Sequence, residues 1–264
     1  MIKLIATDMD GTWLNAKKEY DVDKFREIMR LCKEKDILFV VASGNQYENL
    51  LTRFPKEYIP RMHFVAENGA YVVKGHERLR ISDLNDEEIA TLQEIEKEYP
   101  VFRVWAGVSS AYTLSSFNPN YVKELNKFFA KMTVVDDFSE IKNDRLFKLT
   151  LSTKPGDAPE LARELRQKYP NLDMVAGSDS GVDMSKKGMN KSVGLKFLGQ
   201  RYGIKPSEMV SFGDSGNDVA MMEYTGMSFA TATALPEAKR AAKRIIGSSE
   251  DSSVQNKMLD LLKA

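Results

Sequence analysis

Apolar and polar residues follow each other in blocks along the first third of the chain. Largely apolar runs cover Ile2–Ala6, Ile37–Ala42 and Met62–Ala66, interrupted by Lys3 in the first and by His63 in the third. The six residues of Ile37–Ala42 are all apolar, without the alternation expected of a strand with one face in water. Such runs are typical of strands buried on both faces of a parallel sheet. Helical patterns over Asp21–Lys35 and Gln46–Phe54 separate them. This block therefore predicts a β-α-β-α-β arrangement with right-handed crossovers.

A turn signal follows the third apolar run. Asn68-Gly69 lies between Phe64-Val65 and the short apolar stretch Tyr71–Val73. Asn-Gly between two strand-like segments is a strong hairpin signal, because both residues tolerate positive φ. At the sequence level the pair predicts a turn and nothing further.

The middle of the chain has a different pattern, with helices and strands of mixed alternation. The predicted helices cover Asn85–Glu98, Tyr121–Phe129 and Pro159–Lys168. The predicted strands cover Val101–Trp105, Ala111–Leu114, Met132–Val135, Leu146–Ser152, Leu172–Val175 and Gly181–Met184. This order is typical of an α+β layer with one open sheet face. We interpret residues 83–187 as a domain inserted into the first one.

The last part of the chain returns to the first pattern. Predicted helices cover Ser192–Tyr202, Pro236–Lys243 and Ser253–Lys263, and another ends near Tyr224. Predicted strands cover Met209–Phe212, Met227–Ala230 and Arg244–Ile246. The predicted fold class is α/β: a Rossmann-like, doubly wound parallel-sheet core over 1–82 and 188–264, with an inserted α+β cap domain over 83–187.

Composition narrows the function classes. Hydrophobic residues make up 42% and charged residues 29% of the 264 residues, as in a globular protein with a sizeable core. The 38 basic and 38 acidic residues balance, which argues against a nucleic-acid partner bound through a global basic field. No apolar stretch approaches the length of a membrane span, and the first residues lack a signal-peptide layout. The single cysteine, Cys32, excludes an internal disulfide. We expect a cytoplasmic protein without a membrane or nucleic-acid partner, and a monomer.

Two carboxylates follow the first predicted strand one residue apart. Asp8 and Asp10 precede Gly11 and Thr12 in the sequence IKLIATDMDGT. Open α/β sheets place ligands at the carboxyl ends of their strands. Two acids crowded there repel each other unless a cation or a shared proton relieves them. The alternative is an ordinary strand-to-turn junction in which Asp serves the turn.

Further polar residues fall at equivalent places. Ser43 and Asp214 each follow a predicted parallel strand, Asp218 comes shortly after, and Lys191 begins a helix beside the same edge. Phosphoryl transfer requires such a set: a carboxylate nucleophile, a second acid for the leaving group, oxygen ligands for a hard cation such as Mg²⁺, and donors for the transferring oxygens.

Each of these residues also has an ordinary structural interpretation. Ser43 can cap the helix that follows it. Lys191 can be a solvated surface lysine. Asp218 can be an acid favoured by the dipole at a helix start. The four-part set, and not any single member, supports the catalytic interpretation.

With these motifs in place, the sequence resembles phosphatases of the haloacid dehalogenase superfamily, Cof type, with the class IIB cap. The motifs are Asp8–Thr12 (DMDGT), Ser43-Gly44, Lys191 and Gly213–Asp218 (GDSGND). The resemblance covers nearly the whole chain in order. The segments ASGNQY, from Ala42 to Tyr47, and AENGA, from Ala66 to Ala70, further resemble the bacterial sugar-phosphatase branch.

The resemblance implies roles around the metal. Asp8 is expected to be the nucleophile and an Mg²⁺ ligand. Asp10 is expected to be the general acid and base, with its backbone carbonyl on the metal. Asp214 is the third expected ligand, with Asp218 supporting it and Thr12 fixing the loop after the nucleophile.

The resemblance also implies contacts to the phosphate. Ser43 and the Gly44 amide are expected to hold its oxygens, Lys191 to neutralise nucleophile and phosphate, and Asn217 to touch the phosphoryl group. Asn45 stands where many family members carry arginine, so the substrate contact there lacks a charge and a bidentate fork. We treat this asparagine as a mark of the sugar-phosphatase branch.

The expected activity is Mg²⁺-dependent hydrolysis of sugar phosphate monoesters through an aspartyl-phosphate. Phosphoryl transfer to another sugar hydroxyl, as in a mutase, shares the same nucleophile and stays open. Another small phosphate ester, such as flavin mononucleotide, also stays open as a substrate. A non-catalytic module that binds Mg²⁺ and phosphate is the alternative from another class, and it leaves the second acid unexplained.

Overall fold

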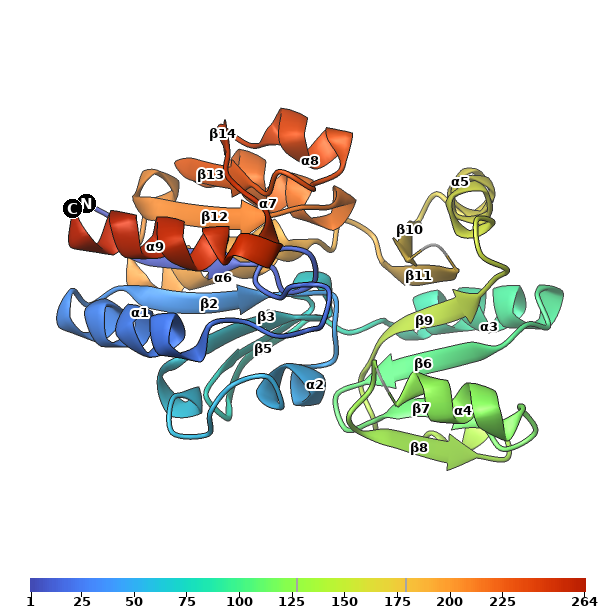
Figure 1. Cartoon of the computed structure of the whole chain (residues 1–264). Helices are drawn as coiled ribbons and strands as arrows, with labels where there is room; N and C mark the ends of the chain where they lie inside the picture. The colour runs from blue at the N-terminus through green and yellow to red at the C-terminus, as the bar shows by residue number, and fades with distance from the viewer. Residues whose placement is uncertain (127, 179) are drawn as a thin grey trace. The chain divides into compact units, whose positions relative to one another are not determined.

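The computed structural model describes residues 1–126, 128–178 and 180–264, which form two compact units (Figure 1). The first unit comprises Met1–Ser43, Phe54–Arg80 and Asn190–Ala264. The second comprises Gly44–Arg53 and Ile81–Met189. The predicted helix over Tyr121–Phe129 includes Lys127, which lies outside the described residues, as does Asp179.

The first unit is built on a sheet whose described strands follow the order β14-β13-β12-β1-β2-β3-β4-β5. Their bounds are β1 Leu4–Thr7, β2 Leu38–Ala42, β3 His63–Ala66, β4 Tyr71–Lys74, β5 Glu77–Ile81, β12 Met209–Gly213, β13 Met227–Ala230 and β14 Arg244–Ile245. The neighbouring strands from β14 to β3 are parallel, and β3 pairs with β4 in antiparallel fashion. The turn between β3 and β4 contains Asn68-Gly69, so the predicted hairpin is confirmed.

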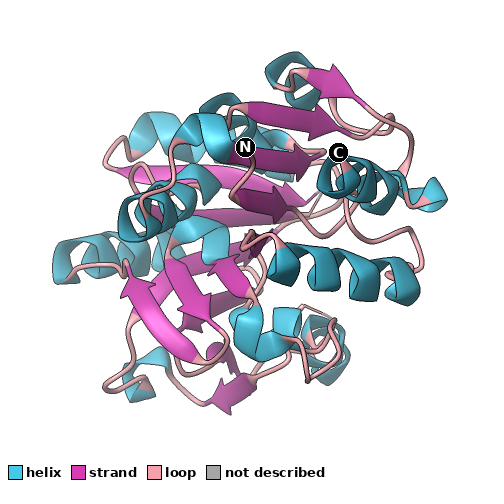
Figure 2. Ribbon diagram, turned by 90° about the vertical axis from the view of Figure 1, so that its left-hand side faces the viewer, coloured by secondary structure: helices cyan, strands magenta, loops and turns pink. Residues whose placement is uncertain are grey.

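Helices lie on both faces of this sheet (Figure 2). They are α1 Val22–Glu34, α6 Lys191–Tyr202, α7 Val219–Tyr224, α8 Pro236–Ala241 and α9 Ser253–Lys263. Leu4 and Ala6 of β1 pack with Leu195 of α6 on one face. The ring of Phe25 on α1 meets Phe39 of β2 edge-on at 6.0 Å on the other. Burial on both faces explains why the sequences of these strands are largely apolar.

The second unit has its own sheet, with the described strands in the order β10-β11-β9-β6-β7-β8. The strands are β6 Arg103–Gly107, β7 Ala111–Leu114, β8 Met132–Val135, β9 Leu146–Ser152, β10 Leu172–Ser178 and β11 Gly181–Lys186; the helices are α2 Tyr47–Leu51, α3 Asp86–Glu98, α4 Pro119–Leu125 and α5 Ala158–Lys168. Asn85 begins α3 with a capping box, because its side chain and that of Glu88 each accept the other's backbone N–H at 2.8 Å.

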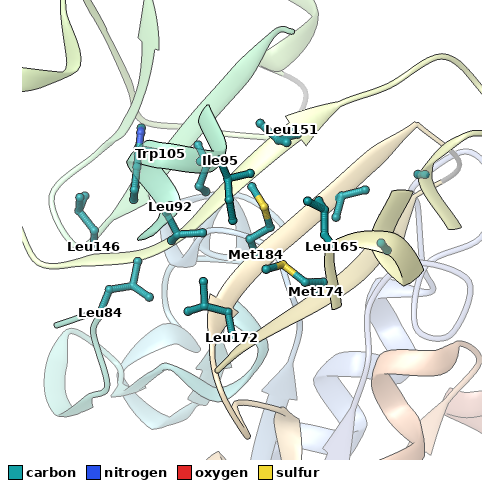
Figure 3. Close-up of a cluster of buried hydrophobic side chains, with 14 residues drawn as sticks. Leu84, Leu92, Ile95, Trp105, Leu146, Leu151, Leu165, Leu172, Met174 and Met184 are labelled. Atoms are coloured by element: carbon teal, nitrogen blue, oxygen red, sulfur yellow. The ribbon is translucent and has the colours of Figure 1, made fainter. Parts of the chain in front are cut away.

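One face of the second sheet carries the apolar core of this unit. Leu92 and Ile95 of α3, Leu165 of α5, and Met184 of β11 pack together there (Figure 3). On the opposite face, Val104 and Ala106 of β6 pack with Leu125 of α4. The sheet is therefore covered by α3 and α5 on one side and by α4 over β6 on the other.

The fold class predicted from the sequence is confirmed, with local differences. Strand β5 was not predicted, because its polar residues Glu77, Arg78 and Arg80 hide the apolar pattern. Residues Gly44–Arg53 were expected in the first domain but pack with the second unit. The side chain of Gln46 donates to the backbone of Lys131 at 2.8 Å and also accepts from it, which holds this segment there.

The described part of the chain contains no helix that is both long enough and apolar enough to cross a membrane.

Candidate active site

Three neighbouring parallel strands of the first unit end at one edge of the sheet. Strand β1 lies between β12 and β2, and Thr7 is in register with Phe212 and Val41. The residues that follow these strands are Asp8, Asp214 and Ser43. From β1 the chain extends the sheet through β2 on one side and β12 on the other, which makes β1 the topological switch point where open α/β sheets bind ligands.

Three carboxylates meet at this edge. One oxygen each of Asp8, Asp214 and Asp218 lies within 4.8 Å of the others. Asp8 and Asp218 are buried, and Asp214 is half-buried. Carboxylate oxygens at this spacing are the donor set that a hard cation such as Mg²⁺ takes.

Lys191 brings a positive charge into the same cluster. Its Nζ atom donates to Asp8 Oδ1 and to Asp218 Oδ1, at 2.6 Å in each case. Asn190 caps helix α6, accepting the Ser192 N–H at 3.0 Å, so Lys191 is the first helical residue. Burial by itself lowers the pKa of the Lys191 ammonium, but Asp218 and Asp8 outweigh it and raise the pKa above its usual value. The lysine therefore stays charged.

Asp218 is held by the backbone as well as by Lys191. Its Oδ2 atom accepts the N–H groups of Asp214 and Ser215 at 2.9 and 3.1 Å. Both of its oxygens are thus engaged by protein donors, and the carboxylate fixes the loop that carries Asp214.

Asp214 reaches the cluster through close contacts with the DMDGT segment. Its Oδ1 atom accepts the Thr12 hydroxyl at 2.7 Å. Gly11 has φ +80°, and a Cβ atom built there would lie 2.6 Å from Asp214 Oδ2. A side chain at position 11 would fill the space that the carboxylate occupies, so both the conformation and the packing require glycine.

The electrostatics of the cluster favour a bound cation. Burial raises the pKa of the Asp8 carboxyl well above its usual range; Lys191 lowers it, and Asp218 and Asp214 raise it further. Burial also raises the pKa of Asp214, against the hydrogen bond from Thr12. Acids that burial and mutual repulsion push towards protonation are relieved by a divalent cation, so the residues present fit Mg²⁺.

The side chain of Asp10 lies outside the cluster formed by Asp8, Asp214 and Asp218. Its Oδ1 atom accepts the Lys18 ammonium at 2.6 Å, and the two side chains are 44% and 52% exposed. The side chain is thus open to solvent, whereas Asp8 is buried. Lys18 was not singled out from the sequence, because it lies in a polar stretch without periodicity. The expected contact of the Asp10 carbonyl with a metal stays a prediction.

The Ser43-Gly44 motif spans the boundary between the two units. Ser43 is buried in the first, where its N–H donates to Val65 O at 2.9 Å. Gly44 and Asn45 belong to the second unit. There the Lys148 ammonium donates to Gly44 O at 3.0 Å and to Asp183 Oδ2 at 2.9 Å, and Thr150 donates to the other oxygen of Asp183. Lys148 and Asp183 were not predicted, because they alternate with core residues as ordinary strand positions do.

Asn217 lies beside Lys191 and contacts Asn68, which the sequence predicts only as part of a turn. Its Oδ1 atom accepts from Lys191 Nζ at 3.3 Å and from the Ser215 hydroxyl at 2.8 Å. Its Nδ2 group donates to Asn68 Oδ1 at 3.2 Å. The sequence does not predict the contact between Asn217 and Asn68, because the turn formed by Asn-Gly already explains an asparagine at position 68.

This arrangement has the parts that phosphoryl transfer needs. Asp8 presents a carboxylate beside a charged lysine, Asp10 presents a second carboxyl that solvent reaches, and the carboxylate cluster fits a hard cation. Nucleophilic attack, proton transfer and charge stabilisation can all occur at this one edge.

A sequence profile of the haloacid dehalogenase-like hydrolases matches residues 5–258, nearly the whole chain. The chain belongs to the haloacid dehalogenase-like hydrolase family.

Similar proteins agree with this family assignment. A relative from Escherichia coli (strain K12), 5-amino-6-(5-phospho-D-ribitylamino)uracil phosphatase YbjI, is 34% identical over 99% of this chain and 97% of its own. The crystal structure of SMU.1108c from Streptococcus mutans UA159 matches with a TM-score of 0.91 and 33% identity over 100% of both chains. The structure of the subclass IIB sugar phosphatase BT4131 matches with a TM-score of 0.83 over 98% of both chains; at 21% identity it shows the fold alone. This haloacid dehalogenase-like hydrolase is an enzyme of the phosphatase type.

Proposed function

We propose that this hydrolase is a Mg²⁺-dependent phosphomonoesterase that works through an aspartyl-phosphate on Asp8. The observation that carries the proposal is the position of Asp8: buried at the end of β1, 2.6 Å from the ammonium of Lys191 and in one cluster with Asp214. At this position the negative charge of Asp8 is balanced by the Lys191 ammonium, and the carboxylate lies at the switch point of the sheet, where open α/β sheets bind ligands.

The proposed reaction has two displacements at phosphorus. In the first, an Asp8 oxygen forms a bond to phosphorus, the bond to the ester oxygen breaks, and Asp10 gives its proton to the leaving alkoxide. In the second, water attacks the phosphorus of the aspartyl-phosphate, Asp10 accepts the proton of that water, and inorganic phosphate leaves while Asp8 is regenerated.

The remaining residues neutralise and position the negatively charged groups of the reaction. Lys191 neutralises Asp8 and the transferring oxygens, and Ser43, the Gly44 amide and Asn217 hold those oxygens. Asn45 adds a neutral amide to the same segment. Thr12 and Asp218 orient Asp214. When bound to Asp8, Asp214 and the Asp10 carbonyl, Mg²⁺ supplies charge neutralisation between carboxylates and phosphate.

We further propose that the second unit, corresponding to the inserted domain expected over 83–187, sets substrate specificity. The residues named above recognise only a phosphate, so the rest of the substrate must be recognised by other groups. Sugar phosphates are the first substrate class, in keeping with the ASGNQY and AENGA segments. The second is a phosphorylated ribitylaminouracil, because the relative with that activity is 34% identical along nearly the whole chain. Both classes carry the phosphate on a hydroxyl-rich chain.

The test is initial-rate phosphate release by purified protein with Mg²⁺ over a panel of sugar phosphates, the phosphorylated ribitylaminouracil and flavin mononucleotide. We expect release that Asp8→Asn abolishes and that chelation of Mg²⁺ stops. Equal release by the wild type and Asp8→Asn would contradict the proposal. Accumulation of isomerised sugar phosphate without free phosphate identifies a mutase, and tight phosphate binding without turnover identifies a non-catalytic binding module.

The expectations of a cytoplasmic location and of a monomer stay predictions. Fractionation of the source cells checks the first, and light scattering of the purified protein checks the second.

A further inference from the structure

The turn between β3 and β4 has an unusual backbone. Glu67 and Asn68 have φ values of 49° and 52°, and Gly69 has φ 97°. Within the described part of the chain, Glu67 and Asn68 are the only consecutive non-glycine residues with positive φ. A positive φ is unfavourable for residues with a Cβ atom, although asparagine tolerates it better than most. Backbone strain of this kind is more frequent at functional sites than elsewhere.

The turn is also packed tightly against the start of α6. A Cβ atom at Gly69 would lie 2.3 Å from the carbonyl oxygen of Asn190, the residue that caps this helix and precedes Lys191. The backbone of the turn therefore has little freedom to relax, and Asn68 is held at one place beside the carboxylate cluster.

Asn68 joins two of the candidate phosphate-binding residues. Its backbone N–H donates to the carbonyl oxygen of Ser43 at 3.0 Å. Its side-chain Oδ1 accepts from Asn217 Nδ2 at 3.2 Å. Ser43 follows β2 and Asn217 follows β12, so one residue connects loops that are distant in sequence.

The contact also determines how the Asn217 amide is turned. Its oxygen faces the donors Lys191 and Ser215, and its NH₂ group faces the acceptor on Asn68. An amide that lost the acceptor on Asn68 would be held only at its oxygen end and could rotate.

We propose that Asn68 is a positioning residue of the active site: its backbone holds Ser43 and its side chain holds the Asn217 amide, so that both face the same phosphate. The inference rests on the proposed phosphatase function and extends it to a residue outside the four motifs. Its effect is on phosphate binding, whichever alcohol the phosphate is attached to.

The conformation of Asn68 allows a substitution that keeps the backbone of the turn and removes only the side chain. Glycine adopts φ 52° without strain, so Asn68→Gly keeps the N–H to Ser43 and loses the contact with Asn217. Asn143 is the matched control: it is an exposed asparagine of the second unit with φ 64°, and Asn143→Gly removes an equivalent side chain that makes no contact with Asn217.

The experiment measures inhibition by inorganic phosphate, together with kcat and KM, for the wild type, Asn68→Gly, Asn217→Ala and the double variant, with Mg²⁺ present. We expect Asn68→Gly to weaken phosphate inhibition by about tenfold and to raise KM for different esters by a similar factor, as loss of one orienting hydrogen bond predicts. The double variant should be no weaker than Asn217→Ala alone, because Asn68 acts through Asn217. Asn143→Gly should match the wild type.

Two results overturn the inference: phosphate inhibition that Asn68→Gly leaves unchanged, or effects of the two substitutions that simply add. Thermal unfolding of Asn68→Gly at or above the wild-type temperature shows that a loss of affinity does not come from unfolding. Absence of Asp8-dependent hydrolysis overturns the proposed function instead, and phosphate binding measured by calorimetry still decides the role of Asn68.

Discussion

The ammonium of Lys191 lies 2.6 Å from the Oδ1 atom of Asp218, and both side chains are fully buried. The same ammonium lies 2.6 Å from Asp8. Two carboxylates therefore share one buried ammonium, which ties Asp8, the proposed nucleophile at the end of β1, to the loop after β12. Removing one member of a buried ionic network leaves its partners without compensation.

Lys191→Met should therefore destabilise the protein and abolish catalysis. We expect the free energy of unfolding to fall by about 3–5 kcal/mol, as for other broken buried pairs. Denaturant titration measures this change. The double variant Lys191→Met/Asp218→Asn should recover much of the stability, because it also removes a buried charge, yet release no phosphate. Wild-type phosphate release by Lys191→Met would exclude a catalytic role for the lysine.

Asp8→Asn and Asp10→Asn should fail at different steps. Asp8→Asn removes the proposed nucleophile and should form no phospho-enzyme. Asp10→Asn removes the proposed proton donor, so it should form the phospho-enzyme slowly from an aryl phosphate, whose leaving group needs little protonation. It should also hydrolyse the phospho-enzyme slowly. Loss of general acid–base catalysis predicts a decrease in turnover of at least about 100-fold. Rapid-quench measurement of acid-precipitable phosphate checks both variants, and a phospho-enzyme in Asp8→Asn would contradict the assignment.

Gly11→Ala should weaken metal binding. The added methyl group meets Asp214 Oδ2 at 2.6 Å and must displace the carboxylate. Gly203→Ala is the control, because Gly203 also has a positive φ, +66°, but a Cβ there meets nothing within 4 Å. Both variants should lose about 1–2 kcal/mol of stability from backbone strain. Calorimetric titration with Mg²⁺ should show reduced affinity only for Gly11→Ala.

His63 should make the protein less stable in mild acid. Burial, together with the positive charges of Lys74 and Arg201, lowers the pKa of its imidazole from 6.5 to about 4. The unfolded chain takes up a proton as the pH falls below 6.5, whereas the folded protein resists until about pH 4. This contribution to stability is therefore complete above pH 6.5 and is lost progressively towards pH 4, by about 3 kcal/mol at one pKa unit per 1.36 kcal/mol.

Unfolding free energies measured from pH 7 to pH 4 check this dependence. The His63→Asn variant should lose the part of the slope that belongs to the buried imidazole. His76→Asn, at an exposed histidine, should keep it. An unchanged slope in His63→Asn would assign the acid sensitivity to other groups.

Lys148→Met should weaken phosphate binding from within the second unit. The ammonium holds the carbonyl of Gly44, whose amide is a proposed phosphate donor, and the Lys148 side chain is 8% exposed. We expect KM to rise by about tenfold, as for one charge-assisted hydrogen bond. Lys186→Met is the control, because Lys186 also donates to a backbone carbonyl, that of Asp83. Equal KM values for the two variants would count against the assignment.

Much of the candidate active site, at the carboxyl ends of β1, β2 and β12, can be predicted from local sequence. Largely apolar runs predict parallel strands, and right-handed crossovers bring the carboxyl ends of such strands to one edge. Asp8, Ser43 and Asp214 are therefore expected together as soon as the strands before them are recognised. The core fold, the β3–β4 hairpin and the start of α6 beside this edge follow from the same periodicities.

Other relationships came only from the tertiary structure. Asn68 and Asn217 lie 149 positions apart, and their contact depends on how β3 and the loop after β12 meet the start of α6. The packing of Gly44–Arg53 with the second unit depends on side-chain bonds from Gln46 and Asn49 to backbone groups about 80 positions away. Periodicity and motifs report which face a residue presents within its own element, whereas a contact between elements depends on packing that no local pattern encodes.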